Sequence, residues 1–406
     1  MNILFFYLPA IAPERGGVER VTSVLADYFE SQGHRCFYLA TIDENADVAH
    51  PHRQFFLPNL EKTDTPENLD FYKKFLREKQ IDVVVFQVGH KKFPWAKFDG
   101  HPPLICSLHL DPCAYDAIIR DKATFKLRKY SPQKRALLSP IWNTLVVPAK
   151  IALRRLKKNA VYRWNYVQCD SYIVLSDAYC KPLAAHLAGG DRSLKIASIP
   201  NPCSYRPIEE NFEKEKILLY VGRLCMNQKR PDLMLEIWSK IESDFPDWQL
   251  EMLGSGNDAD EVKTIAEIRK IPRVHFRGFT APEPYFKKAP LLCMTSSNEG
   301  FGMVLLEAST FGCVPVAFDA FPTAHDILEN GKTGILVPPL DTDDYAQKLR
   351  SLMNGKTAID PAACKENARR YAIESIGEKW LDLFKNLTSK PKTIPILVND
   401  KHNQLE

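Results

Sequence analysis

The sequence predicts an α/β protein built from two doubly wound domains, each a parallel β-sheet covered by helices on both faces. Short, almost uninterrupted apolar segments alternate with longer segments of helical periodicity along the chain, which is typical of parallel strands buried on both faces. The chain has 406 residues, more than a single hydrophobic core usually holds. Residues 199–216 contain three prolines followed by a charged run, and this linker composition divides the chain into similar halves.

The first domain, residues 1–200, is expected to contain five strands. They are the apolar segments 2–8, 35–41, 82–88, 104–109 and 171–176. The first segment lacks the basic residues and the small-residue cleavage site of a signal peptide, so we interpret it as a buried strand. No window offers the roughly 20 uninterrupted apolar residues of a membrane-spanning helix, so none is expected.

The second domain, residues 217–375, follows the linker 201–216 and shows the same alternation. Its predicted strands are the segments 216–223, 249–254, 274–279, 291–297, 314–318 and 334–338. One long final helix is expected at about 361–386, with residues 376–387 packing back toward the first domain. The remaining segment, 388–406, has the composition of a disordered tail.

Two such domains leave a cleft between the carboxyl ends of their strands, where ligands bind in doubly wound sheets. The segment SSNEGFGMVLLEASTFGCVPV, residues 296–316, supplies a strand end, a loop and a helix there. Its glycines let a ligand approach the backbone, and the helix N-terminus favours a phosphate. The carboxylates of Glu299 and Glu307 suit the vicinal hydroxyls of a sugar and a ribose. The alternative is that Glu299 caps the helix and Glu307 is solvated.

Two cations follow the first strand of the second domain in YVGRLCMNQKRPDL. A guanidinium from Arg223 and an ammonium from Lys229 at a strand end suit a diphosphate leaving group, although each taken alone is also consistent with a surface cation. The turn MLGSGNDAD places Gly254 at the end of the next strand. It lacks the complete G-x-G-x-x-G pattern, which weakens a dinucleotide interpretation.

The first domain has two candidate positions at the same cleft. Gly16 and Gly17, in PERGGVERV, lie between the first strand and the first helix, where the backbone can face a phosphate or simply form a tight turn. His109 ends a strand in SLHLDP. A lone histidine is more often structural than functional, so both interpretations stay open.

A metal site is not expected. The pairs Asp258–Asp260 and Asp341–Asp343 each precede a predicted helix, where aspartates cap free N–H groups. The ten cysteines are scattered singly, with no C-x-x-C pair. That pattern suits a reducing compartment better than a disulfide framework or a zinc site.

The segment from Arg120 to Arg163 carries thirteen basic residues and one acidic residue, within a chain whose formal charge is only +4. Such a basic region predicts an anionic partner. Part of it, AKIALRRLKKNAVYRWNYV, is expected to form a helix whose apolar contacts are Ile151, Leu153, Leu156, Val161 and Trp164. We interpret it as a peripheral site for an anionic membrane surface; the alternative is a solvated basic helix. No nucleic-acid-binding module is recognisable, so no nucleic acid is expected.

Taken together, these motifs resemble the retaining GT-B glycosyltransferases of the glycosyl transferases group 1, or family-four, type. The resemblance rests on the E-x7-E spacing of Glu299 and Glu307, on GGVER, on GR with its following lysine, on GSG, on RGF at 277–279 and on NGKTGILVPPLD, in the family's order. It covers most of residues 1–385 and implies two Rossmann-like domains facing each other across a cleft.

The resemblance also implies roles for individual residues. Glu299 would grip the donor sugar, Arg223 and Lys229 would hold the diphosphate, and His109 would lie near the transferred sugar. Glu307 would bind the ribose hydroxyls. Further donor contacts would come from Gly16, Gly17, Gly254, Arg277, Gly278, Phe279, Phe301, Gly302 and Met303. No cofactor and no metal would be required.

The implied function is retaining transfer of a hexose-type sugar from a nucleotide diphosphate sugar, with UDP as the default nucleotide. The acceptor would be a lipid-linked or other glycan in surface polysaccharide, lipopolysaccharide or glycolipid biosynthesis, at the cytoplasmic face of the membrane. The alternatives are a non-catalytic scaffold that binds a nucleotide sugar or anionic lipid, and a related sugar phosphorylase or epimerase. A hydrolase using the two glutamates would not explain the phosphate-binding motifs.

Overall fold

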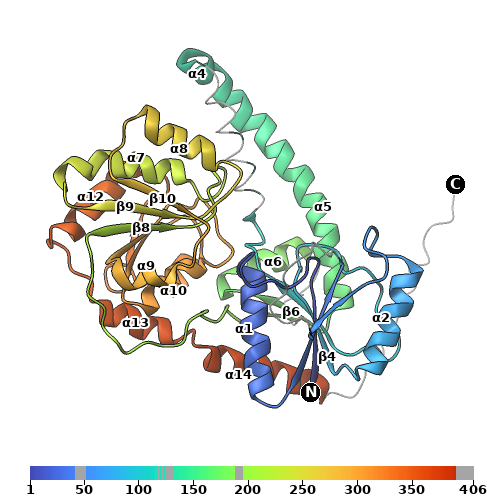
Figure 1. Ribbon diagram of the computed structural model, residues 1–406. Helices are drawn as coiled ribbons and strands as arrows, with labels where there is room; N and C mark the ends of the chain where they lie inside the picture. Colours follow the sequence, from blue (N-terminus) through green and yellow to red (C-terminus); the bar gives the residue numbers. More distant parts are fainter. Residues whose placement is uncertain are drawn as a thin grey trace.

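The computed structural model describes residues 1–41, 52–114, 116, 119, 123, 131–187 and 195–389. It contains two α/β domains, one at each side of Figure 1. The first has a seven-stranded sheet of order β3-β2-β1-β4-β5-β6-β7, and the second a six-stranded sheet of order β10-β9-β8-β11-β12-β13. The strand pairs are parallel in both sheets. The predicted pair of doubly wound domains is therefore confirmed.

The first sheet contains the five predicted strands and two more. Its strands are β1 Asn2–Phe6, β2 Arg35–Ala40, β3 Gln54–Phe56, β4 Val83–Phe86, β5 Leu104–Leu108, β6 Ser171–Val174 and β7 Ile196–Ser198. The two that the sequence did not predict, β3 and β7, have three residues each and lie at the sheet edges. They are only partly buried, so they lack the apolar run that marks a central strand.

The helices of the first domain cover both faces of its sheet, except for one that extends away from it (Figure 1). They are α1 Gly17–Ser31, α2 Pro66–Glu78, α4 Pro132–Ile141, α5 Val147–Gln168 and α6 Cys180–Leu187, with a π-helical turn η1 Trp142–Val146 and a 3₁₀ turn η2 Asp177–Tyr179. Helix α1 buries Val21, Leu25 and Phe29, which are spaced by four residues and therefore share one face. That face fixes α1 against the sheet and places its N-terminus after β1.

The second sheet contains all six predicted strands: β8 Ile217–Val221, β9 Gln249–Leu253, β10 Val274–Gly278, β11 Leu291–Met294, β12 Val314–Phe318 and β13 Ile335–Val337. Its helices are α7 Pro231–Ile241, α8 Ala259–Ile268, α9 Glu283–Lys288, α10 Met303–Thr310, α11 Thr323–Ile327 and α12 Thr342–Met353, with a 3₁₀ turn η4 Glu242–Asp244. The strand order reverses between β8 and β11, and in the first sheet between β1 and β4. Ligands of doubly wound sheets bind at such reversals.

The predicted single helix over 361–386 is wrong. The chain forms α13 Pro361–Arg369 and α14 Ile373–Thr388 instead. Between them the carbonyl of Tyr371 accepts a hydrogen bond from the backbone N–H of Cys203 at 2.7 Å, and Ala372 is extended. Helix α14 then packs against α1 of the first domain, with the rings of Phe29 and Phe384 5.5 Å apart. Of the predicted tail, Thr388 ends α14, and residues 390–406 lie outside the described residues.

Helices α4 and α5 are joined through η1 into one helical arm, residues 132–168, which extends away from the first sheet (Figure 1). The base of the arm is tied to the loop after β4. Asn165 donates to the carbonyls of Gly89 and Lys91 at 2.9 and 2.7 Å and accepts from the N–H of Phe93. Within the part of the chain that the structure describes, no helix is both long and apolar enough to cross a membrane.

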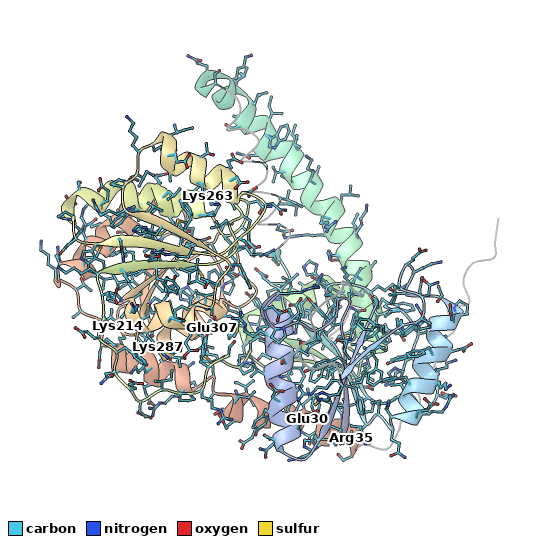
Figure 2. All side chains as sticks on the ribbon, viewed as in Figure 1. Glu30, Arg35, Lys214, Lys263, Lys287 and Glu307 are labelled. Carbon is cyan, nitrogen blue, oxygen red and sulfur yellow. The ribbon has the colours of Figure 1, made fainter. Side chains whose placement is uncertain are left out.

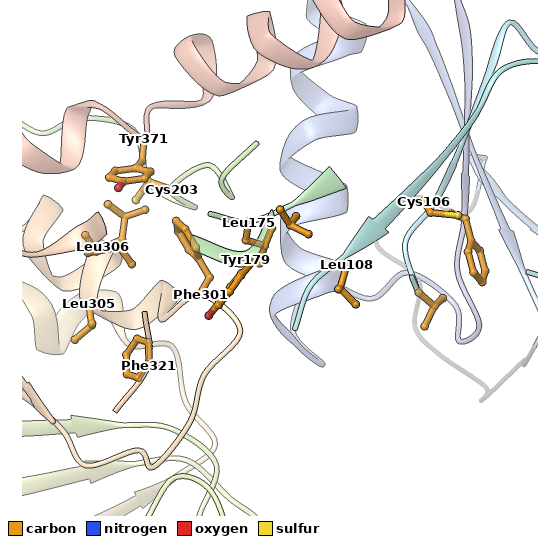
Figure 3. Packing of buried hydrophobic residues seen from close by; sticks show 14 of the residues in the cluster. Cys106, Leu108, Leu175, Tyr179, Cys203, Phe301, Leu305, Leu306, Phe321 and Tyr371 are labelled. Atoms are coloured by element: carbon orange, nitrogen blue, oxygen red, sulfur yellow. The ribbon is translucent and has the colours of Figure 1, made fainter. Parts of the chain in front are cut away.

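The two domains meet through a shared apolar cluster. Leu175 and Tyr179 of the first domain lie beside Phe301 of the second, as Figure 3 shows. The linker adds Cys203, and Tyr371, between α13 and α14, contributes a ring 5.8 Å from that of Phe301. This contact holds the loop that follows β11 against the first domain.

Candidate active site

A buried ion pair lies at the strand reversal of the second sheet. The ammonium of Lys229 is 2.5 Å from Oε1 of Glu299, and the two side chains are only 15% and 9% exposed. Lys229 belongs to the loop after β8, and Glu299 to the loop after β11, the neighbouring strand. The fold thus brings together a cation and a carboxylate that stand 70 residues apart in the sequence. Glu299 is paired rather than acting as a helix cap.

Arg223 lies at the start of the same loop as Lys229 and is exposed. Its guanidinium donates to Oε1 of Gln228 at 3.2 Å, and the amide of Gln228 donates to the carbonyl of Asn298 at 3.3 Å. The backbone N–H of Ser297 also donates to the carbonyl of Gln228. These contacts tie the Arg223–Lys229 loop to the loop that carries Glu299.

The glycine turn after β9 supports the position of Arg223. A Cβ added to Gly254, whose φ is +137°, would lie 2.0 Å from the carbonyl oxygen of Gly222. A Cβ added to Gly256 would lie 2.5 Å from the carbonyl oxygen of Leu224. Both glycines therefore permit backbone-to-backbone packing against the loop after β8. In the described structure this is how Gly254 contributes to the site.

The conformation of the loop before α10 is fixed by backbone geometry and by a hydrogen bond to its backbone. Gly302 precedes the helix with φ +95°, a conformation that strains residues with a side chain. The carbonyl of the buried Phe301 accepts a hydrogen bond from the hydroxyl of Thr323 at 2.8 Å. Met303 opens the helix and is partly buried. The first N–H groups of α10 are thus presented close to Glu299, an arrangement that favours an anion.

Glu307 lies within α10, and its side chain is 2% exposed. Its Oε1 accepts from Nη1 of Arg20 at 3.2 Å and from the hydroxyl of Ser204 at 2.8 Å. The alternative of a solvated Glu307 is therefore wrong. Arg20 and Ser204 are not among the predicted site residues, although Arg20 stands inside the quoted motif GGVER. Only the fold reveals that α1 of the first domain reaches α10 of the second.

The paired glycines of the first domain differ in their surroundings. Gly16 precedes α1, and a Cβ there would lie 2.6 Å from Oε2 of Glu19. At Gly17 an added Cβ would meet no atom within 4 Å in the described structure. Gly16 thus permits a local contact with the first turn of α1, whereas Gly17 faces open space.

His109 is buried at the end of β5. Its Nε2 is 2.7 Å from Oε1 of Gln87, and the amide nitrogen of Gln87 donates to the hydroxyl of Thr22. This orientation of Gln87 makes Nε2 of His109 the donor and leaves Nδ1 as an acceptor. Burial lowers the pKa of His109 to about 4, so the ring is neutral at physiological pH. Nδ1 is buried and has no partner at hydrogen-bond distance in the described part of the chain, and the side chain of Asn201, which approaches the ring, partly offsets the effect of burial on the pKa of His109.

His109 contacts the second domain through its backbone. A Cβ added to Gly300 would lie 2.1 Å from the carbonyl oxygen of His109, so only glycine allows these two loops to touch. Nearby, the hydroxyl of Tyr179 donates to the carbonyl of Glu299 at 3.4 Å. The structure therefore brings His109 of the first domain next to the Glu299 loop of the second.

The three predicted donor contacts at 277–279 differ in what they can do. The guanidinium of Arg277 forms two hydrogen bonds to the carboxylate of Glu251, at 2.6 and 2.8 Å, and this contact raises the pKa of Arg277. Gly278 has φ +66° and an open surrounding. Phe279 is 67% exposed. The side chain of Arg277 is therefore committed to Glu251, while the ring of Phe279 is available to a ligand.

The two aspartate pairs have structural partners. Oδ2 of Asp258 accepts from the backbone N–H of Met226 at 2.7 Å, and its side chain does not cap α8 as expected. Asp341 does cap α12 by accepting from two backbone N–H groups. Among the described residues no group of three or more His, Cys, Asp or Glu side chains is arranged to hold a metal ion.

The five apolar side chains predicted to share one face of the arm do not do so. Ile151 is buried against the protein, and Val161 and Trp164 are partly buried, with the indole of Trp164 donating to the carbonyl of Phe93. Leu153 and Leu156 are 59% and 68% exposed. The predicted set is thus split between the inner and outer sides of the arm. Part of the predicted basic segment lies outside the described residues: Arg120, Lys122, Lys126, Arg128 and Lys129.

Two family models match the chain. Glycosyltransferase Family 4 matches residues 15–203, and Glycosyl transferases group 1 matches residues 204–371. The boundary between them falls in the linker. Together they cover both domains and all the candidate residues described above.

Individual proteins show the same likeness. An uncharacterized glycosyltransferase of Haemophilus influenzae is 29% identical over 52% of this chain, and the chain spans 60% of that relative's length. The GalNAc-alpha-(1->4)-GalNAc-alpha-(1->3)-diNAcBac-PP-undecaprenol alpha-1,4-N-acetyl-D-galactosaminyltransferase of Campylobacter jejuni is 26% identical over 76% of this chain and 90% of its own. The solved structure of Anabaena HepE in complex with UDP-glucose superposes with a TM-score of 0.65 at 16% identity, covering 95% of this chain and 100% of the other. That superposition shows a shared fold.

Proposed function

The chain belongs to the GT-B glycosyltransferases of group 1, and from this premise we propose that it transfers a hexose-type sugar from a nucleotide diphosphate sugar to a cell-surface glycan or its lipid-linked precursor. The observation that carries the proposal is the meeting of Lys229, Glu299 and the His109 loop at the strand ends of both domains. The reaction class is supported by the relatives from Haemophilus influenzae and Campylobacter jejuni, which are glycosyltransferases by name.

The Lys229–Glu299 pair is suited to receive the donor. Without donor, each charge neutralises the other, which avoids the large free-energy cost of an unpaired buried charge. A diphosphate offers Lys229 a stronger anion, and a sugar hydroxyl offers Glu299 a hydrogen-bond donor. Donor binding thereby replaces one ion pair by two ligand contacts, with Arg223 on the same loop adding a second cation near the diphosphate.

The transfer step follows from where charge develops. The bond between the anomeric carbon and the diphosphate oxygen breaks, and negative charge builds up on the leaving nucleoside diphosphate. The fixed cations and the first N–H groups of α10 stabilise that charge more than they stabilise the ground state. The acceptor oxygen forms the new bond from the same face, and its proton passes to the leaving phosphate. The anomeric configuration is thereby retained, and these cations supply the neutralisation without a metal ion.

His109 is assigned to the sugar on the first-domain side. The ring is neutral because burial holds its pKa at about 4, and its Nδ1 is an acceptor with no protein partner among the described residues. A sugar hydroxyl that donates to Nδ1 would satisfy this buried atom, which otherwise carries a desolvation cost. His109 and Glu299 would then hold the same sugar from opposite domains.

We propose UDP as the nucleotide. The support is the UDP-glucose complex of Anabaena HepE, whose fold this chain shares, together with the exposed ring of Phe279, which offers a flat apolar face to a base. Gly278 leaves the approach to that ring open. Arg277 contributes through its ion pair with Glu251, which fixes the end of β10.

The acceptor is proposed to be membrane-borne, with the enzyme peripheral on the cytoplasmic face. The name of the Campylobacter jejuni relative includes undecaprenol, which supports a lipid-linked acceptor. Residues 131–168 contain no Asp or Glu, and six large apolar side chains of the arm are exposed: Leu137, Ile141, Leu145, Leu153, Leu156 and Val167. Apolar side chains among cations, without carboxylates, suit an anionic lipid surface. The full arm therefore replaces the narrower predicted helix face as the membrane contact.

The function is tested with purified enzyme, a panel of UDP-sugars and a lipid-diphosphate glycan acceptor. Wild-type protein should release UDP and form a product whose anomeric configuration, read by NMR, matches that of the donor, with or without EDTA. Lys229→Ala and Glu299→Gln should each lower kcat/KM by about a hundredfold or more, because they remove groups that act on the transition state. Lys263→Ala, on the exposed face of α8 (Figure 2), is the matched control and should keep full activity.

The outcomes separate this proposal from its alternatives. Donor binding with neither transfer nor slow donor hydrolysis would favour a non-catalytic scaffold. Turnover that requires phosphate, or that proceeds without an acceptor, would favour a phosphorylase or an epimerase. Absence of any thermal stabilisation by the whole panel of nucleotide sugars would contradict the donor class itself, since a tightly bound ligand must stabilise the fold.

A further inference from the structure

We propose that Arg20 is a positioning residue of the donor site, which orients the carboxylate of Glu307 for the nucleotide ribose and so makes ribose recognition depend on the first domain. This inference rests on the proposed function, because it takes Glu307 as the ribose-binding group. It adds a residue from outside the nucleotide-binding domain, whose contact with that site is visible only in the folded chain.

Three separate segments converge on one oxygen atom of Glu307. Arg20 comes from α1 of the first domain, Ser204 from the linker, and Glu307 from α10 of the second domain. Nη1 of Arg20 and the hydroxyl of Ser204 both donate to Oε1, at 3.2 and 2.8 Å. Figure 2 shows Glu307 where the second domain faces α1. Because both protein donors use Oε1, the acceptor capacity of Oε2 is left for the hydroxyls of a ligand.

The burial of Glu307 explains why it needs a counter-charge. Its side chain is 2% exposed, whereas that of Arg20 is 31% exposed. A carboxylate removed from water is strongly destabilised unless a cation or several hydrogen bonds compensate it. The guanidinium supplies both a charge and a directional donor, so it fixes the plane of the carboxylate as well as neutralising it.

Arg20 itself is held in place. Its Nε donates to the carbonyl of Pro13 at 3.4 Å, and the neighbouring residue Val21 is 1% exposed in the core of the first domain. Because its side chain is partly exposed, the guanidinium lies at the edge of the site. The arrangement suits a residue that acts on the ligand through Glu307. A residue that contacted the diphosphate directly would give a different pattern of losses, which the following experiment distinguishes.

Isothermal titration calorimetry with UDP and with 2′,3′-dideoxy-UDP separates the two roles, because the second ligand keeps the base and diphosphate but lacks the ribose hydroxyls. We expect Arg20→Met to weaken the affinity for UDP by about tenfold or more, which is the effect of losing one charge-assisted hydrogen bond. The affinity for 2′,3′-dideoxy-UDP should not change. Arg20→Lys should recover part of the loss. Arg77→Met, an exposed arginine of α2 in the same domain, removes the same charge and should change neither affinity.

A second variant tests whether the effect passes through Glu307. In the Glu307→Gln background the Arg20→Met change should add little, since the carboxylate that it orients is already gone. Equal losses for both nucleotides would overturn the proposal and assign Arg20 to the diphosphate. A loss in Arg20→Met that is not recovered by lysine and that accompanies a lower melting temperature would assign it to the domain interface alone. Wild-type protein that binds neither nucleotide would instead contradict the proposed function.

Discussion

At the residue scale, the site is organised by charges that are paired before any ligand arrives. Lys229 with Glu299, and Arg20 with Glu307, each join a cation and a largely buried carboxylate. Sequence motifs mark both glutamates, but they do not show which cation faces which acid. That assignment depends on adjacent strands in one case and on two different domains in the other.

The first prediction concerns the stability of the Lys229–Glu299 pair. Lys229→Met alone should lower the free energy of unfolding by about 3 kcal/mol, because it leaves Glu299 as a buried charge without a partner. The double variant Lys229→Met/Glu299→Gln should lose less free energy of unfolding, since both charges are gone. It should remain inactive. Urea unfolding of the two variants measures the difference. Equal stability of the single and double variants would contradict the pairing.

A second prediction concerns acid stability. Burial lowers the pKa of His90, His101 and His109 from 6.5 to about 4. In the unfolded chain these imidazoles therefore become protonated near pH 6.5, whereas in the folded chain they become protonated only near pH 4. The stability that these histidines contribute is fully present above pH 6.5 and is lost as the pH falls toward 4. Melting temperatures should drop across this window, with a shallower slope in His101→Gln. A flat profile would show that the rings are solvated.

At the element scale, the arm is the least expected feature. Helix periodicity of about 100° per residue places Leu153 and Leu156 roughly opposite the buried Val147 and Ile151, so an apolar strip faces solvent along the outer side of α5. Lys150, Lys157 and Arg163 flank it. An exposed apolar strip normally has a binding partner, and the flanking cations indicate an anionic one.

The corresponding prediction is that the arm binds anionic vesicles. Wild-type protein should float with phosphatidylglycerol vesicles and not with phosphatidylcholine vesicles, and about 0.5 M NaCl should weaken the binding by screening. Leu153→Ser/Leu156→Ser should abolish flotation while leaving UDP-sugar hydrolysis unchanged. Ile268→Ser serves as the control, because Ile268 is an apolar residue at the end of α8 that is 76% exposed.

Two results would contradict this assignment. Equal flotation of the leucine variant and wild type would move the membrane contact elsewhere. A concentration-dependent dimer in light scattering that the leucine substitutions dissociate would show that a second copy of the chain covers the strip.

At the scale of the whole molecule, the two domains are joined by more than the linker. Helix α14 crosses back to α1, and Leu175 and Tyr179 pack beside Phe301. These contacts hold the His109 loop against the Glu299 loop, so the site forms only when both domains are in place. The stability of the contact between α14 and α1 should therefore affect the donor site, although α14 does not itself belong to it.

This coupling gives a further prediction. A Cβ at Gly377 of α14 would lie 2.2 Å from Cε1 of Tyr28 on α1, so Gly377→Ala should destabilise the protein by about 1–3 kcal/mol through overpacking. Tyr28→Ala should relieve the clash in the double variant. Urea unfolding measures both. If Gly377→Ala is as stable as wild type, α14 does not pack against α1 as described.

The sequence by itself determined the fold class, eleven of the strands, and the positions of the polar loops, because alternating apolar segments and glycine-rich strand ends are local signals. It did not reveal the edge strands β3 and β7 or the break before α14, since short half-buried strands and a turn fixed by a distant backbone contact carry no local pattern.

Only the tertiary structure decided which charges face each other. Arg20 meets Glu307, and Arg277 is taken by Glu251, because these contacts join segments far apart in the chain. It also decided which side of the arm faces solvent. A helix with apolar residues all round has no unique buried side until a neighbour covers one. Here Ile119 and Ala123 pack on the side of Ile151, and the loop after β4 covers Asn165.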